Sequence, residues 1–119
     1  MSLTDRELLE LAAKAVGING TWCQFPGMIE RHGLDGAIYD EVECEYWNPL
    51  QDDGDALRLA LELEMPIHPC RVWKSYRVDS CSDFVEASRS VMPPSDPAAT
   101  RRAIVDVAAE IGKAMQEKH

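Results

Sequence analysis

Three carboxylates within four residues are the side chains in this sequence with the clearest potential for chemistry. Asp52, Asp53 and Asp55 offer the hard oxygen ligands that Mg²⁺ or Ca²⁺ prefers. With His32 or His68 as a general base, they could serve a metal-dependent hydrolase or a nucleic-acid-modifying enzyme. Aspartates at this spacing are also typical of a helix start, where they cap free amides and oppose the helix dipole. Because the calcium-loop pattern of an EF-hand is not completed, the spacing favours the capping interpretation.

A second acidic group lies just before the aspartates. Glu41, Glu43 and Glu45 alternate with mostly apolar residues, so we predict one continuous strand over residues 37–46. Side chains two residues apart on a strand point the same way but stand about 7 Å apart, too far to share a proton or one ion. The glutamates therefore predict a solvated acidic strand face rather than a catalytic pair. Asp40 is the one polar residue among the apolar positions of this stretch.

A zinc site is a further alternative. His68 and Cys70 could provide two ligands, with Cys81 or Cys44 as another. Structural zinc sites usually have two pairs of closely spaced ligands, and this sequence has only one such pair. The four cysteines also lack the spacing of a compact disulfide framework. We therefore expect no metal or other cofactor, and reduced cysteines.

Composition restricts the function classes. The formal net charge of −9 argues against direct binding to nucleic acid, which needs clustered Lys and Arg, and permits contact with a basic protein surface. No apolar run approaches the roughly 20 residues that cross a bilayer, and the N-terminal stretch is charged where a secretory signal would be apolar. The 119 residues suit a single domain over 1–119, with a frayed C-terminal tail at 116–119.

Helix signals occur at three places in the chain. Thr4 and Glu7 form a capping-box pattern before a first helix. A turn at residues 48–49 precedes a central helix that begins near Asp53, with Ala56, Leu57, Ala60 and Leu61 on its buried face. Asp96 followed by proline predicts the start of a last helix.

Strand-like stretches fill the intervals between these helices, at residues 18–25, 37–46, 70–78 and 84–91. This order predicts an α+β domain: one antiparallel sheet of four to six strands with three helices packed on it, in the order helix, two or three strands, helix, two or three strands, helix. If neighbouring strands pair in this way, Arg71 and Arg77 could neutralise the glutamates of residues 41–45.

Three stretches carry a family resemblance: TDRELLELAAKAVGI, EYWNPLQDDGDALRLALEL and DPAATRRAIVDVAAEIGKAM. Together they resemble a group of small hypothetical proteins encoded by bacteriophages and prophages of Gram-negative bacteria, and more distantly the phage α/β/α sandwich domains. The resemblance covers about half the chain. It implies a small accessory protein in the host cytoplasm, and it carries no catalytic residues over to this sequence.

Two functional hypotheses follow. The first is a non-enzymatic protein that binds a host or phage protein, with Glu41, Glu43, Glu45, Trp47 and Trp73 as candidate binding residues and a homodimer as a further possibility. In a more specific form, its acids imitate DNA phosphates and inhibit a host defence complex. The alternative is the metal-dependent enzyme based on the three aspartates.

Overall fold

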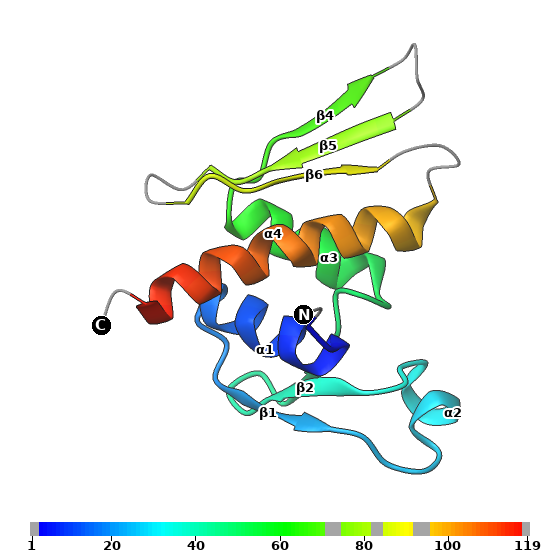
Figure 1. Cartoon of the computed structure of the whole chain (residues 1–119). Helices are drawn as coiled ribbons and strands as arrows, with labels where there is room; N and C mark the ends of the chain where they lie inside the picture. Colours follow the sequence, from blue (N-terminus) through cyan, green and yellow to red (C-terminus); the bar gives the residue numbers. More distant parts are fainter. Residues whose placement is uncertain (1–2, 71–74, 82–84, 92–95, 118–119) are drawn as a thin grey trace.

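The long helices of this protein lie between two antiparallel sheets, whereas a short helix lies at one end of the first sheet (Figure 1). The computed structural model describes residues 3–70, 75–81, 85–91 and 96–117. Its elements follow the order α1 (Asp5–Val16), β1 (Gly20–Cys23), α2 (Met28–His32), β2 (Ala37–Asp40), β3 (Glu45–Trp47), α3 (Asp53–Glu62), β4 (Ile67–Cys70), β5 (Ser75–Asp79), β6 (Ser88–Val91) and α4 (Pro97–Glu117). The α+β class is confirmed.

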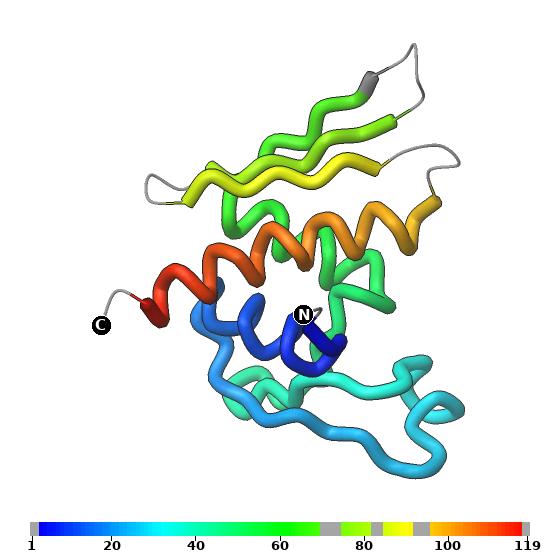
Figure 2. Tube along the Cα trace, viewed as in Figure 1, coloured from blue at the N-terminus to red at the C-terminus, as the bar shows by residue number. Residues whose placement is uncertain are grey.

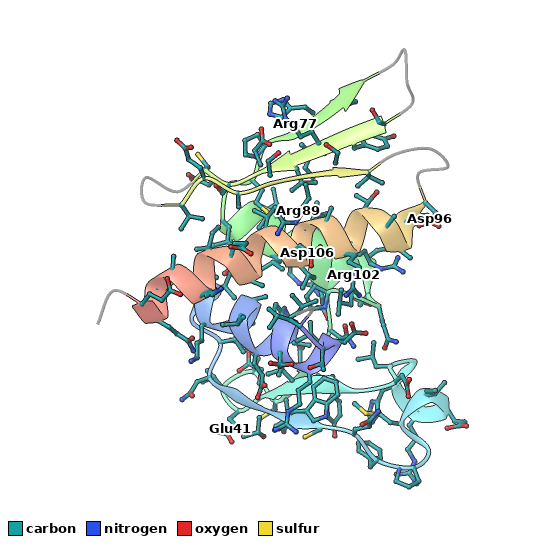
Figure 3. The ribbon with its side chains drawn as sticks, viewed as in Figure 1. Glu41, Arg77, Arg89, Asp96, Arg102 and Asp106 are labelled. Atoms are coloured by element: carbon teal, nitrogen blue, oxygen red, sulfur yellow. The ribbon has the colours of Figure 1, made fainter. Side chains whose placement is uncertain are left out.

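The predicted antiparallel pairing is confirmed, and the predicted order of helices and strands is matched apart from one additional helix, but the prediction of a single sheet is wrong. Within the described residues the strands form two three-stranded sheets, ordered β1-β2-β3 and β4-β5-β6, and α2 is a fourth helix. Figure 2 shows that the chain passes from the first sheet to the second sheet through α3. The second sheet lies on the other side of the helices from the first. Arg77 therefore cannot neutralise the glutamates: it pairs with Asp79, and Figure 3 shows it on the opposite side of the molecule from Glu41. Arg71 lies outside the described residues.

The predicted strand over residues 37–46 is a hairpin instead. The Asp40 carboxylate accepts hydrogen bonds from the amides of Val42 (3.0 Å) and Glu43 (3.2 Å), which closes a turn after β2. Its carbonyl accepts the amide of Cys44, whose positive φ of 58° reverses the chain into β3. Two short strands and a turn share the alternating pattern of one long strand, so the polar residue at position 40 was the signal for the break.

The second sheet begins earlier than predicted. β4 starts at Ile67, before the strand predicted over residues 70–78, and it includes Pro69. Pro69 is tolerated because β4 is an edge strand, where one side of the backbone needs no partner. The predicted strands over 70–78 and 84–91 correspond to β5 and β6, with residues 71–74 and 82–84 outside the described part of the chain.

The last helix is central to the core. The predicted cap is confirmed, because the amide of Ala99 donates to the Asp96 carboxylate at 2.7 Å. α4 packs on α1, α3, β5 and β6. Its buried residues form a broad apolar surface: Ala103, Ile104, Val105, Val107, Ala108, Ala109, Ile111 and Gly112. Of the expected tail, Gln116 and Glu117 are helical.

α1 lies beside α4 and runs in the same direction. The predicted capping box is confirmed: the Glu7 amide donates to the Thr4 hydroxyl at 3.2 Å, and the Thr4 amide donates to the Glu7 carboxylate at 3.1 Å. Further along, Gly112 permits the close approach of the two backbones, since a Cβ on it would stand 1.9 Å from the carbonyl oxygen of Leu11. No helix among the described residues has the length and apolar character needed to cross a membrane.

We expect Gly112→Ala to destabilise the protein, although alanine is ordinarily about 1 kcal/mol better than glycine inside a helix. The new methyl group would overlap the Leu11 carbonyl and push α1 away from α4. Overpacking of this kind costs about 1–3 kcal/mol of unfolding free energy or more. Urea unfolding measures the loss, with Gln116→Ala on the same helix as a control of little effect; a stabilised Gly112→Ala variant would contradict the close approach.

Candidate functional site

The turn between β2 and β3 presents an acidic surface. We call Glu41, Glu43 and Glu45 the acidic turn; all three are exposed, and none takes part in an ion pair between described residues. They do not lie along one strand face as predicted, because the first two are in the turn itself and Glu45 opens β3. The turn concentrates their charge at one end of the first sheet.

An acidic cleft of about 350 Å³ adjoins this turn, between the first sheet and α3. Its carboxylate-bearing lining residues are Asp40, Glu43, Glu45, Asp55 and Glu62. Arg58 also lines it, but its guanidinium is bound to Asp55 at 2.7 Å. That hydrogen bond is the main cause that raises the pKa of Arg58, and Asp52 and Glu45 add to it through their charge. The cleft keeps an excess of negative charge.

The three aspartates of the central stretch do not converge on a cation. Asp52 caps α3 by accepting the Asp55 amide at 2.8 Å, as the helix-start interpretation predicted. Asp53 forms an ion pair with Arg101 of α4. Asp55 is buried and binds Arg58. Each carboxylate therefore has its own structural partner, and the arrangement does not supply a shared metal site.

Asp55 also joins the first sheet to α3. Its second carboxylate oxygen accepts the backbone amide of Asn48 at 2.9 Å, just after β3 ends. Asn48 is itself buried, donates to the carbonyl of Gly36 at 2.6 Å, and accepts the amides of Leu50 and Gln51. The turn that sequence analysis placed at residues 48–49 is thus held by a satisfied buried polar network.

A polar network on the outer face of the second sheet contains a serine, an aspartate and a histidine. Their hydrogen bonds do not follow the serine–histidine–aspartate order of a catalytic triad. Asp79 accepts from the Ser88 hydroxyl at 2.7 Å and lies 3.1 Å from the His68 imidazole. The hydrogen bond from Ser88, with a smaller contribution from Arg77, lowers the pKa of Asp79. In a nucleophilic triad the histidine stands between the other two groups and activates the serine. Here the aspartate is in the middle, so the serine is not bonded to the histidine that would activate it.

The proposed zinc ligands are dispersed. His68 is engaged with Asp79, Cys44 belongs to the turn of the first sheet, and Cys81 is exposed. The side chain of Cys70 lies outside the described residues. Among the described parts of the chain, no three His, Cys, Asp or Glu side chains gather closely enough to hold a metal ion.

The remaining candidates from the sequence are aromatic residues and a histidine. Trp47 is only 9% exposed and packs in the core, so its ring is not a surface anchor. It faces inward because it stands opposite Ile38 on the inner side of the first sheet. Trp73 lies outside the described residues. His32 packs against Tyr46, with ring centroids 4.6 Å apart and ring planes tilted by 56°.

A further cleft, of about 800 Å³, lies between α1, α4 and Arg89 of β6. Its charges compensate one another: Arg102 pairs with Asp5 at 3.1 Å, and Arg89 lies 3.5 Å from Glu110. Figure 3 shows Arg89 and Arg102 on either side of Asp106, whose pKa is raised by burial. Internal pairing leaves this cleft without a strong preference for a charged ligand.

Sequence analysis missed an apolar surface on α3. Leu57 and Leu61 were predicted to be buried, but they face solvent, while Ala56, Leu59 and Ala60 form the buried side. The prediction was wrong because this helix carries two neighbouring apolar stripes with the same four-residue spacing. Ala56 and Ala60 belong to one stripe, and Leu57 and Leu61 belong to the other. The signal that separates them is Asp55: once it binds Asn48, the rotation of α3 is fixed.

Comparisons with models of known protein families, with curated proteins and with solved structures find no match for this chain.

We expect Asp55→Ala to cost about 1–3 kcal/mol of unfolding free energy, because it leaves the buried amide of Asn48 without an acceptor. Asp53→Ala is the matched control on the same helix turn, and it removes only an ion pair of a largely exposed carboxylate, worth about 0–1 kcal/mol. Urea unfolding of both variants measures the difference. An equal loss of unfolding free energy in the two variants would contradict the structural role of the buried Asp55 hydrogen bond.

Ser88→Ala should raise the pKa of Asp79 toward its ordinary value, because the main hydrogen bond to that carboxylate is lost. A lowered pKa in the folded state stabilises the protein above the unfolded-state pKa, and this stabilisation disappears as pH falls through the folded-state value. Ser88→Ala should therefore weaken stability at neutral pH and converge with wild type in acid. NMR titration of the Asp79 carboxyl signal measures this change in pKa. Ser90→Ala, on the same sheet face, is the control and should leave the pKa of Asp79 lowered.

Proposed function

We propose that this protein is an accessory protein of a phage or prophage that works without catalysis, by binding a basic surface on a host or phage protein in the host cytoplasm. The observation that carries the proposal is the acidic turn, in which exposed glutamates stand beside a cleft lined by further carboxylates. Complementary charge of this kind raises association rates and selects partners by the sign of their surface. The resemblance of the three sequence stretches supplies the biological setting.

The arrangement of the candidate catalytic groups favours binding over chemistry. The aspartates that could have held a cation are each engaged in capping, an ion pair or a buried hydrogen bond. The Ser88 hydroxyl donates to the Asp79 carboxylate and not to a histidine. The same negative charge that suits a basic protein surface also disfavours direct contact with nucleic acid.

A more specific form of this proposal is an inhibitor of a host defence complex. Carboxylates fixed on a turn can occupy the positions that DNA phosphates take on a basic protein groove. Asp40 holds the acidic turn through its side chain and its carbonyl, so the glutamates that follow it are carried on a fixed backbone. Glu62 extends the negative surface from the turn onto α3.

The experiment is affinity capture from host lysate at physiological salt, followed by a binding measurement with the protein that is retained. The triple variant Glu41→Gln, Glu43→Gln, Glu45→Gln should bind about tenfold more weakly, since three exposed ion pairs at about 0.5 kcal/mol each are lost.

A charge-matched control separates the turn from net charge alone. Glu30→Gln, Glu86→Gln, Glu117→Gln removes the same charge from exposed positions outside the acidic cleft and should bind as wild type does. Equal weakening of the two triple variants, or no retained protein, would contradict the proposed function.

A further inference from the structure

Four large apolar side chains that belong to α3 and the second sheet face solvent. They are Leu57 (58% exposed), Leu61 (67%), Ile67 (40%) and Tyr76 (39%). Scattered apolar residues are normal on protein surfaces, whereas a contiguous group often marks an interaction site. We call these four residues the apolar slot, and their contiguity follows from the elements that carry them.

Leu57 and Leu61 lie one turn apart on the same side of α3. Leu57 and Tyr76 line a common cleft of about 380 Å³ between α3, β5 and the start of α4. Ile67 is paired with Val78, so it lies on the same sheet face as Tyr76 and diagonal to it. The slot is therefore one surface made from a helix flank and a sheet face.

The slot exists because α4 covers only part of the second sheet. α4 packs on β5 and β6, and β4 is the edge strand on the other side of β5 (Figure 1). Sheet residues that point toward the helices at this edge, such as Ile67, lie beside α3 without being buried under α4. The side of the slot at β4 is therefore open to solvent.

Among the described residues, the charges that line the cleft of the slot are mainly negative. Asp53 and Asp96 line its cleft, where Arg101 is already paired with Asp53. On the other flank of α3, Glu62 follows Leu61 directly and lines the acidic cleft together with Glu43. α3 is thus a ridge with an apolar side and an acidic side.

We infer that this ridge and slot bind a basic amphipathic helix of the partner protein. The apolar side chains of that helix pack on the slot, and its Lys and Arg side chains contact the carboxylates of the acidic cleft. The inference rests on the proposed function and specifies the partner surface. α3 is about 15 Å long, so roughly ten residues of partner helix would cover it. Such helices bind through apolar residues at intervals of three and four positions.

Two other occupants fit the surface less well. An added strand would have to pair with the free edge of β4, where Pro69 has no amide to donate. A second copy of this chain also carries a net charge of −9, so like charge disfavours its approach to this acidic surface. A basic partner helix therefore suits the slot better than a second copy of this chain.

A synthetic peptide tests the inference directly. The probe is a leucine–lysine peptide of about 14 residues, long enough to span α3 as a helix, with leucines at helical spacing. Three peptides are compared by NMR titration: this one, a scrambled isomer with the same charge but no apolar face, and a leucine–glutamate version. We expect only the first to shift the amide signals of α3 and β5 strongly.

Two double variants locate the binding. Leu57→Ser, Leu61→Ser should weaken the leucine–lysine peptide about tenfold, since both leucines lose apolar contact worth about 0.7 kcal/mol each. Both positions are exposed, so the fold should be retained, as thermal unfolding can verify. Leu3→Ser, Ile29→Ser replaces exposed apolar residues outside the slot and the acidic turn and should bind as wild type does.

Several results would overturn the inference. These are equal binding of the scrambled peptide, shifts confined to other elements, and a concentration-dependent dimer in sedimentation velocity that Leu57→Ser, Leu61→Ser abolishes. Capture from host lysate distinguishes this inference from the proposed function. If that variant and the wild type retain the same partner equally, the inference about the slot is wrong and the proposed function stands. If the peptide binds the slot but no partner is captured, the inference about the slot is supported and the proposed function is contradicted.

Discussion

The buried hydrogen bond between the Asp55 carboxylate and the Asn48 amide fixes the rotation of α3, and the surface of the protein depends on that rotation. A helix with two overlapping apolar stripes can bury either of them. With Asp55 directed toward the end of β3, Leu59 turns into the core and Leu57 turns out. Arg58 then lies at the acidic cleft. One buried carboxylate therefore determines both the apolar and the acidic flank of this helix.

A second constraint is the contact between α1 and α4. The absence of a side chain at Gly112 allows the two helices to form a tight layer, and each sheet packs on this layer from one side. The outer faces of the sheets must then be stabilised separately. On the first sheet, Met28 of α2 covers Ala37 and Leu34 in a small second core. On the second sheet, the outer face carries the polar network centred on Asp79.

The sequence was a good guide to features that depend on a few adjacent residues. The caps at Thr4, Asp52 and Asp96 were predicted because a side chain and an amide two or three positions on are enough to form them. The acidic turn was likewise predicted to be solvated, since glutamates rarely enter a core without partners.

The division into two sheets and the apolar slot could not be predicted in this way. An alternating pattern is the same for one strand and for two strands joined by a turn, and only the bonds of Asp40 distinguish them. The rotation of α3 depends on Asn48, which lies in another element. The strand predicted to start at residue 70 begins at Ile67, because β4 is an edge strand that tolerates Pro69. In each case the deciding contact joins segments that sequence patterns treat separately.

The two flanks of α3 would contribute differently to a complex. Exposed carboxylates act over a Debye length of about 8 Å at physiological salt, so the acidic cleft chiefly accelerates encounter with a basic partner. Apolar contact acts only at short range and mostly slows dissociation. Charge alone would give fast but weak binding to many basic surfaces, and the apolar slot alone would not discriminate between acidic and basic helices. Because α3 carries Leu61 and Glu62 side by side, both requirements can be met by one helix of suitable chemistry.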